Sequence, residues 1–338
     1  MIVFPTVAAF EGALHTLPVP DEAAIAEAMA RQASLTKPAG SLGQLEEIAL
    51  FIAGWQSRAR PRMARGQAII FAGNHGVTKH GVSAFPPEVT AQMVANFETG
   101  GAAINALAAA AGLELKVVAL DLDRTTGDFT TGPAMSEADC LAALSIGAAA
   151  LANDELDLLV LGEMGIGNST AASALCARSF GGTAAEWAGP GTGMDATGIA
   201  RKAEVVTRGL AFHADAPATA FETLRRLGGR EIAAIAGAVL AARHRRIPVL
   251  LDGFICCAAM APLAVANPAI TAHCLAGHCS AEPGHARLLE RLGLDPLLRL
   301  GMRLGEGSGA AVAASIVRAA LAAHNGMATF AQAGVSSA

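Results

Sequence analysis

The sequence predicts an α/β fold in which helices flank a parallel sheet, joined to a small helical domain built from both ends of the chain. Two observations carry this prediction. Between residues 61 and 300, short apolar runs alternate with longer helical patterns, whereas both ends show helical patterns without neighbouring strands. The composition, 53% hydrophobic and 16% charged, excludes a disordered chain. A length of 338 residues is ample for a buried core. We therefore place a large α/β domain at 61–300 and a discontinuous helical domain at 1–60 with 301–338.

Four short apolar runs are the strand candidates, and each ends in glycine or an acid. They are QAIIFAG (67–73), LKVVALD (115–121), LDLLVLG (156–162) and IPVLLDG (247–253). Because these runs are apolar on both faces, they are typical of buried parallel strands. A weaker fifth candidate is AITAHCL (269–275).

Helical patterns separate the strands and fill the chain ends. Those in the large domain span 88–111, 137–152, 168–179, 195–213 and 230–245, and those at the ends span 21–34, 43–57 and 308–324. Ligands of open parallel sheets bind outside the carboxyl ends of the strands. We therefore expect the functional residues in the loops GNHGV (73–77), GEMGIGNST (162–170), DGFI (252–255) and GHCSAEPGH (277–285).

Charge and cysteine content argue against several classes of protein. The net charge is −5. The richest basic stretch, 243–246, ends a helix pattern, where cations interact favourably with the helix dipole. We therefore interpret this stretch as a helix cap and not as a nucleic-acid-binding patch. No apolar stretch reaches the roughly 18–20 residues of a membrane span. The N-terminus lacks the basic region of a signal peptide. We expect a cytoplasmic protein whose six cysteines are reduced core thiols, with no nucleic-acid or membrane partner.

The loop GEMGIGNST follows a predicted strand and opens a helix. Its glycines permit tight turns, and free N–H groups at a helix start bind phosphate. The spacing is close to a Walker A motif but has Asn168 in place of the lysine that contacts the β/γ phosphates, which disfavours an NTPase and leaves room for a single phosphate. The alternative is a glycine-rich turn with a helix cap. Glu163 in this loop would repel phosphate, so we expect it to face a cationic or N–H-bearing substrate.

Three further segments leave alternatives open. Lys202, one of only four lysines, is either a phosphate partner or a solvated helix residue. Asn74 and His75, at a strand end, are either catalytic or satisfy backbone groups. The histidines and cysteines of AHCLAGHCSAEPGH (272–285) lack a standard zinc spacing, because adjacent His-Cys pairs on a strand point to opposite sides. We therefore predict no metal site there.

RLGEGSGAA (303–311) contains the only acid after Asp295, in a tail made mostly of small and aliphatic residues. An unpaired carboxylate in apolar surroundings is costly, so its position calls for a reason. Glu306 is either an acid at the N-terminus of the helix 308–324 or a functional carboxyl group whose activity requires apolar surroundings.

Eight ordered motifs, from about residue 20 to the end, together resemble one family, that of nicotinate-nucleotide–dimethylbenzimidazole phosphoribosyltransferase. They are KPAGSLGQLE (37–46), FAGNHGV (71–77), GVSAFPPEVTAQMV (81–94), GEMGIGNSTAASAL (162–175), GTGMDATGIARK (191–202), LLDGFI (250–255), GHCSAEPGH (277–285) and RLGEGSGAA (303–311). The resemblance implies a Rossmann-like domain with a small helical domain, and a homodimer. It also implies transfer of the phosphoribosyl group of nicotinate mononucleotide to 5,6-dimethylbenzimidazole. The products would be nicotinate and α-ribazole 5′-phosphate, used in assembling the nucleotide loop of cobalamin.

The resemblance also assigns roles to residues. By motif, Glu306 is the catalytic base and Glu163 the second acid. The phosphate and ribose elements are Gly165, Gly167, Asn168, Ser169, Thr170 and Lys202, and the base pocket contains Phe85, Met93, Met164 and Leu304. Phe85 and Met93 stand where some members carry polar residues, and Asn74 stands where the family usually has Asp.

The chemistry fits these residues. The nicotinate leaving group is already a pyridinium and departs without a general acid. When one benzimidazole nitrogen attacks the ribose, the N–H on the other ring nitrogen becomes acidic. One carboxylate base to accept that proton therefore suffices. A carboxyl in an apolar pocket has its pKa raised toward the useful range near neutral pH. Conversion of a β-nucleotide to an α-riboside is inversion, which direct displacement gives. No metal or other cofactor is needed.

Two other functions stay open on the residues alone. One is an altered, non-catalytic relative that binds a benzimidazole or its riboside, motivated by Asn74 and Phe85. The other is a mononucleotide kinase or NTPase using 162–170, which the missing loop lysine disfavours.

Overall fold

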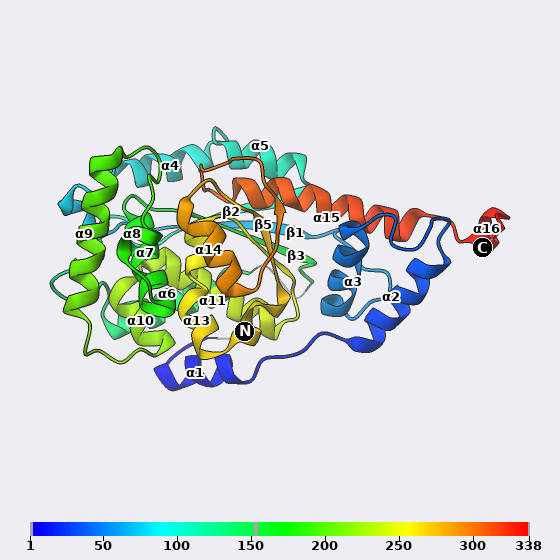
Figure 1. Cartoon of the computed structure of the whole chain (residues 1–338), viewed down its shortest axis with the longest axis horizontal. Helices are drawn as coiled ribbons and strands as arrows, with labels where there is room; N and C mark the ends of the chain where they lie inside the picture. Colours follow the sequence, from blue (N-terminus) through cyan, green and yellow to red (C-terminus); the bar gives the residue numbers. More distant parts are fainter. Residues whose placement is uncertain (1–2, 152–154, 337–338) are drawn as a thin grey trace.

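A computed structural model describes residues 3–151 and 155–336 and has a six-stranded parallel sheet of order β2-β1-β3-β4-β5-β6. The strands are β1 (Gly66–Ala72), β2 (Leu113–Ala119), β3 (Leu158–Met164), β4 (Val249–Leu251), β5 (Cys274–His278) and β6 (Pro296–Leu298). Helices cover both of its faces (Figure 1). The predicted fold class is confirmed.

Alternate residues of the central strands point into two separate cores. Ile69 and Leu161 belong to the larger core, whereas their neighbours Ile70 and Val160 belong to the smaller one. In Figure 1, α4, α5 and α15 lie above the sheet and α1 and α13 below it. Burial on both faces explains why the central strands read as continuous apolar runs.

The helices are α1 (Val7–His15), α2 (Glu22–Ser34), α3 (Gln44–Gln56), α4 (Glu88–Glu98), α5 (Ala103–Ala110), α6 (Glu137–Ala150), α7 (Asn168–Phe180), α8 (Ala184–Trp187), α9 (Ala196–Phe212), α10 (Ala220–Leu227), α11 (Arg230–His244), α12 (Phe254–Ala258), α13 (Ala261–Ala266), α14 (Pro283–Leu292), α15 (Ser308–Gly326) and α16 (Phe330–Ala333). All eight predicted helical patterns correspond to helices here. The last residue of the predicted helix 137–152 lies outside the described residues.

Two predicted elements were placed wrongly. The helix expected over 88–111 is broken at residues 99–102, where Gly100 has a φ of 83°. The Asn105 side chain closes the break: its oxygen accepts from the Ala102 N–H at 3.0 Å, and its amide nitrogen donates to the Phe97 carbonyl at 2.8 Å. The strand expected at 269–275 begins only at Cys274, because Pro268 and the Asn267 cap start a 3-10 helix over Pro268–His273.

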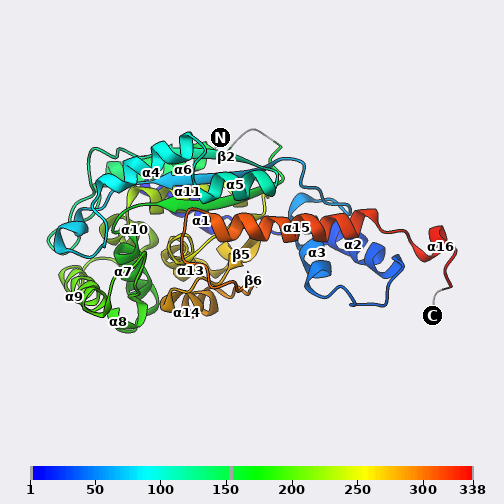
Figure 2. The same ribbon diagram turned by 90° about the horizontal axis from the view of Figure 1, so that it is seen from above.

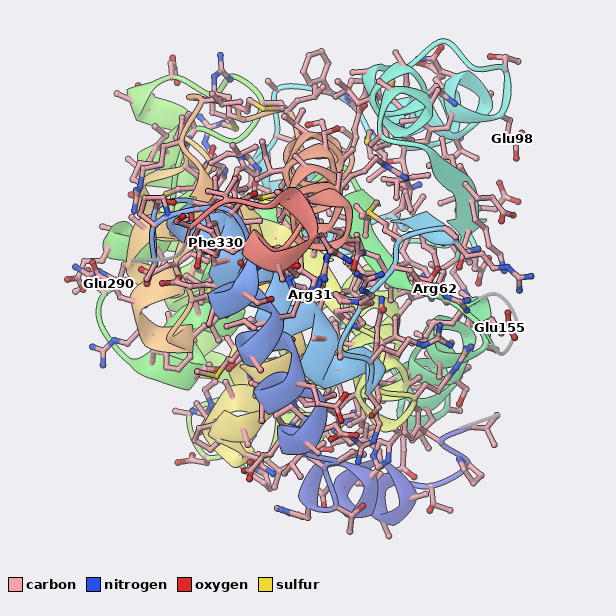
Figure 3. The ribbon with its side chains drawn as sticks, turned by 90° about the vertical axis from the view of Figure 1, so that its right-hand side faces the viewer. Arg31, Arg62, Glu98, Glu155, Glu290 and Phe330 are labelled. Carbon is pink, nitrogen blue, oxygen red and sulfur yellow. The ribbon has the colours of Figure 1, made fainter. Side chains whose placement is uncertain are left out.

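Segments from the N-terminal and C-terminal parts of the chain lie together at one end of the molecule, where α2, α3, the far half of α15 and α16 extend beyond the sheet (Figures 1 and 2). Arg31 holds them together: its Nε donates to the His324 carbonyl at 2.8 Å and its Nη2 to the Asn325 carbonyl at 3.0 Å. Figure 3 looks onto this end and shows Arg31 beside the end of α15. Helix α1 lies elsewhere, against α10, through the Phe10–Phe221 ring contact. The domain boundaries at 60/61 and 300/301 stay predictions.

Within the described residues, no helix is both long enough and apolar enough to cross a bilayer. The cytoplasmic location stays a prediction.

Helices α6 and α11 touch backbone to backbone, so we predict that Gly237→Ala destabilises the protein. An added Cβ at Gly237 would lie 2.7 Å from the Leu144 carbonyl carbon, and one at Gly147 would lie 2.7 Å from the Ala234 Cα. Alanine normally favours a helix interior by about 1 kcal/mol over glycine. Here overpacking reverses the sign, and the free energy of unfolding in urea should fall by about 1–3 kcal/mol.

Gly12→Ala in α1 is the matched control, since no atom lies within 4 Å of its added Cβ. This control should be neutral or stabilising by up to about 1 kcal/mol. A G237A protein as stable as G12A would contradict the close packing of α6 on α11.

Candidate functional site

The carboxyl ends of β3, β4 and β5 border an open cavity. It is lined by residues 82–84, 163–169, 190–192, 253–255 and 303–305, with Met194, Lys202, His278, Ser280 and Glu282. These segments include parts of three of the four loops in which we expected function, 162–170, 252–255 and 277–285.

The turn before α15 holds Glu306 in an uncommon backbone conformation. Gly305, Glu306 and Gly307 have φ values of 83°, 62° and 77°. For a residue with a side chain, the left-handed region costs about 1–2 kcal/mol. The Asp252 carboxylate compensates by accepting from the Gly307 N–H at 3.2 Å and the Ala310 N–H at 2.9 Å. The turn also packs on Gly162, where an added Cβ would lie 2.7 Å from the Glu306 carbonyl carbon.

The Glu306 side chain is buried and its Oε2 atom has no hydrogen-bond partner among the described residues. Burial, and secondarily the negative charge of Asp252, raises the pKa of Glu306 to about 7. A carboxyl with this pKa exchanges its proton near neutral pH, as a general base must.

Glu163, at the end of β3, also lies beside this turn. Its Oε1 would lie 2.8 Å from a Cβ added to Gly305, and its Oε2 accepts a hydrogen bond from the Asn168 amide. Burial raises the pKa of Glu163 to about 8, and the charges of Glu231, Asp252 and Glu306 act in the same direction. Glu163 is therefore neutral at neutral pH, and the two predicted acids lie in one electrostatically coupled cluster.

The other end of the cavity carries positive charge. Helix α7 begins here, and Lys202 of α9 donates from Nζ to the Ser169 Oγ at 3.0 Å and to the Gly189 carbonyl at 2.7 Å. Lys202 is 1% exposed, which excludes the interpretation as a solvated helix residue. Burial lowers the pKa of its ammonium. Arg303 is a second cation of the cavity lining, and it donates to the Gly191 carbonyl at 3.4 Å.

Not every predicted residue lines the cavity. Met164, Leu304 and Glu163 do, as do Gly165, Gly167, Asn168, Ser169 and Lys202. Thr170 and Glu306 are buried and do not line it, and Glu306 directly follows the lining residue Gly305. Phe85 and Met93 need correction as wall residues: Phe85 is 47% exposed, and Met93 packs against the smaller core because α4 turns it that way. The wall there consists of Val82, Ser83 and Ala84.

Comparison with known proteins gives one consistent result. A phosphoribosyltransferase family model matches residues 17–335. The chain is 73% identical over 333 residues to the nicotinate-nucleotide–dimethylbenzimidazole phosphoribosyltransferase of Novosphingobium aromaticivorans, covering 98% of both chains. It is 58% identical over 320 residues to the enzyme of the same name from Rhodobacter capsulatus, covering 95% of each.

The chain belongs to the nicotinate-nucleotide–dimethylbenzimidazole phosphoribosyltransferase family. It is thus a pentosyltransferase. The fold agrees: the crystal structure of CobT from Thermus thermophilus matches with a TM-score of 0.86 at 41% identity, covering 94% of this chain and 100% of that one.

Within this phosphoribosyltransferase, Asn74 serves the backbone. Its amide nitrogen donates to the Leu122 carbonyl at 2.9 Å. His75 instead pairs with a buried acid, its Nε2 lying 2.6 Å from the Glu231 Oε1. Neither Asn74 nor His75 lines the cavity, so both act behind it.

Sequence reasoning missed several polar residues of the site, which are Glu231, Asp252, Ser280, Glu282 and Arg303. Two left a signal in the sequence: Glu231 is an acid at the start of an otherwise apolar helix, and Asp252 is an acid directly after a buried strand. The other three look like ordinary loop residues, and only the fold brings them to the cavity.

Because the Glu163 pKa is higher in the folded state, we predict that Glu163→Gln changes how stability depends on pH. The carboxyl has a pKa near 4.5 when unfolded and about 8 when folded. The folded protein binds the proton more tightly, so this contribution is complete below pH 4.5 and is lost as pH rises toward 8. As pH rises through this range, the stability of Glu163→Gln relative to the unsubstituted protein should increase by up to about 1.4 kcal/mol per pH unit.

Urea unfolding of both proteins at pH 5.5 and pH 7.5 measures this difference. Glu290→Gln, on the exposed side of α14, is the matched control and should keep the original slope (Figure 3). Parallel pH profiles for Glu163→Gln and the unsubstituted protein would show that Glu163 is ionised throughout.

Proposed function

We propose that this enzyme transfers the phosphoribosyl group of nicotinate mononucleotide to 5,6-dimethylbenzimidazole, forming α-ribazole 5′-phosphate and nicotinate for cobalamin nucleotide-loop assembly. The substrates are those in the names of its relatives from Novosphingobium aromaticivorans and Rhodobacter capsulatus. The single observation that carries the mechanism is the arrangement of the cavity, with the buried Glu163 and the adjoining Glu306 turn at one end and Lys202 with the start of α7 at the other.

The cationic end suits the phosphate of the nucleotide. Free N–H groups at a helix start and the helix dipole both favour an anion. Lys202, already hydrogen-bonded to Ser169, is held at this helix start, and Arg303 lines the same cavity. A phosphate bound here extends the ribose toward Glu163 and Glu306.

The acid end suits proton removal from the attacking base. One benzimidazole nitrogen forms a bond to the anomeric carbon of the ribose. The bond from that carbon to nicotinate breaks, and its electron pair neutralises the pyridinium nitrogen. The remaining benzimidazole N–H proton passes to the Glu306 carboxylate. Attack opposite the leaving group inverts the β-linkage to α.

Glu163 complements this step because it is neutral. Two carboxylates in one buried site do not both ionise easily, so the proton on Glu163 leaves the negative charge available to Glu306. The pKa of about 7 for Glu306 places its ionised form within reach at neutral pH. A general base of this kind contributes about 10²–10⁴ in rate.

We predict that Glu306→Gln lowers kcat by about 10²–10⁴ and changes the KM values little, because the amide keeps the shape and cannot accept the proton. Purified protein, nicotinate mononucleotide and a panel of benzimidazole, adenine and phenolic acceptors are incubated, and nicotinate and the α-nucleotide are separated by chromatography. Glu98→Gln, at the exposed end of α4, is the control (Figure 3). Full turnover by the Glu306→Gln protein would remove Glu306 from the role of base.

We also propose that the enzyme is a homodimer, as its family resemblance implies. A helical end of the molecule projects beyond the sheet (Figure 2). It exposes apolar side chains, such as Met29 of α2, which is 55% exposed and which a second copy could cover. Sedimentation equilibrium should give about twice the 34.0 kDa chain mass. A mass of one chain at every concentration tested would contradict the dimer.

A further inference from the structure

An acid stands at the cationic end of the cavity, where an anion is expected to bind. Glu282 precedes α14 and lines the cavity with Lys202 and Arg303. It is 8% exposed, and its Oε1 has no hydrogen-bond partner among the described residues. A buried carboxylate beside a bound dianionic phosphate would be strongly repelled, so its presence needs a chemical reason.

Glu282 and Lys202 share the cavity without forming an ion pair within the described part of the chain. The Lys202 ammonium donates instead to Ser169 and to the Gly189 carbonyl. The space between them therefore fits a group that accepts from an ammonium and donates to a carboxylate. A phosphate carrying one proton has both kinds of oxygen, since its P–O⁻ accepts and its P–OH donates.

We propose that Glu282 and the substrate phosphate share one proton, so that this end of the cavity takes up a proton when a phosphate binds. This inference rests on the proposed function, which places the phosphate at the start of α7. The proton balance is simple. Free phosphate monoester at pH 7.5 is mostly a dianion, because its second pKa is about 6. One proton from solvent then lies between a phosphate oxygen and the Glu282 carboxylate.

The local packing is built around this carboxylate. An added Cβ at Gly189 would collide with the Glu282 Oε2, so the absence of a side chain at that position leaves room for the Glu282 carboxylate. Burial raises the pKa of Glu282, while Lys202, the Gly191 N–H and Arg303 act in the opposite direction. The net direction is upward, which favours a bound proton.

The other ionisable groups around Glu282 leave this balance unchanged. On its own helix, burial lowers the pKa of His285 to about 3, so that ring is neutral. On α12, burial raises the pKa values of Cys256 and Cys257, which remain thiols. On α8, Glu186 forms a surface pair with Arg287 at 2.8 Å. Helix α7 contributes the uncharged Ser169. Glu163 and His278 also line the cavity, so the difference between the unsubstituted enzyme and Glu282→Gln identifies the proton that Glu282 and the phosphate share.

Isothermal titration calorimetry in buffers of different ionisation enthalpy measures the proton count directly. The ligands are two phosphate monoesters, methyl phosphate and nicotinate mononucleotide, at pH 7.0 to 8.5, because a monoester dianion carries no proton of its own. We expect the unsubstituted enzyme to take up roughly one proton per ligand, with Kd rising up to about tenfold per pH unit. Glu282→Gln should bind both ligands without proton uptake and with a Kd that is nearly constant over this range.

Glu282→Asp is the second variant, since it keeps an ionisable group and should retain proton uptake with weaker binding. Thermal unfolding of both variants confirms that they fold. Proton uptake that persists in Glu282→Gln would assign the proton to another group, such as Lys202, Glu163 or Glu306, and overturn the proposal. A Glu282 effect seen with nicotinate mononucleotide but not with methyl phosphate would assign the carboxylate to a ribose hydroxyl and overturn it as well.

The failure of the two proposals looks different. Binding of both ligands without proton uptake by the unsubstituted enzyme rejects the role of Glu282 alone. Absence of any binding of nicotinate mononucleotide by the folded enzyme rejects the proposed function itself, and the role of Glu282 with it.

Discussion

The site depends on the Asp252 carboxylate, which joins the end of β4 to the first turn of α15. Its two oxygens accept from the backbone N–H groups of Gly307 and Ala310. Hydrogen bonds to a charged group contribute about 1.5–3 kcal/mol each, enough to offset the left-handed backbone at Glu306. The same charge also raises the Glu306 pKa. One side chain thus fixes both the position of the expected base and part of its basicity.

This anchor also explains how a residue far along the chain reaches the centre of the sheet. Helix α15 runs from the sheet to the projecting end, where Arg31 binds the carbonyls of its last turn. Near its start, Gly309 packs directly against the His278 ring. A long helix fixed at both ends holds the turn before it in place, so the Glu306 loop needs little packing of its own.

The sequence predicted the parts of this structure that depend on local pattern. The central strands are continuous apolar runs, and the loops after them were correctly expected to meet at one edge of the sheet. Features that depend on individual side-chain contacts were not predicted. The break at residues 99–102 depends on the Asn105 side chain, and the burial of Lys202 depends on Ser169 and Gly189 from other segments. Phe85 was expected in the base pocket by its motif, but its side chain is 47% exposed and the lining there consists of residues 82–84.

The first two residues of α7 connect the two ends of the cavity. The Asn168 amide donates to Glu163 at the acid end, and the Ser169 hydroxyl accepts from Lys202 at the cationic end. Because these side chains belong to consecutive residues of one buried helix, the separation between the acid end and the cationic end cannot vary independently of the helix itself. A substrate with an anion at one end and a reacting carbon at the other meets two groups at a fixed spacing. The helix start that resembles a phosphate loop therefore has a second task, which is to set the distance from the phosphate to the chemistry.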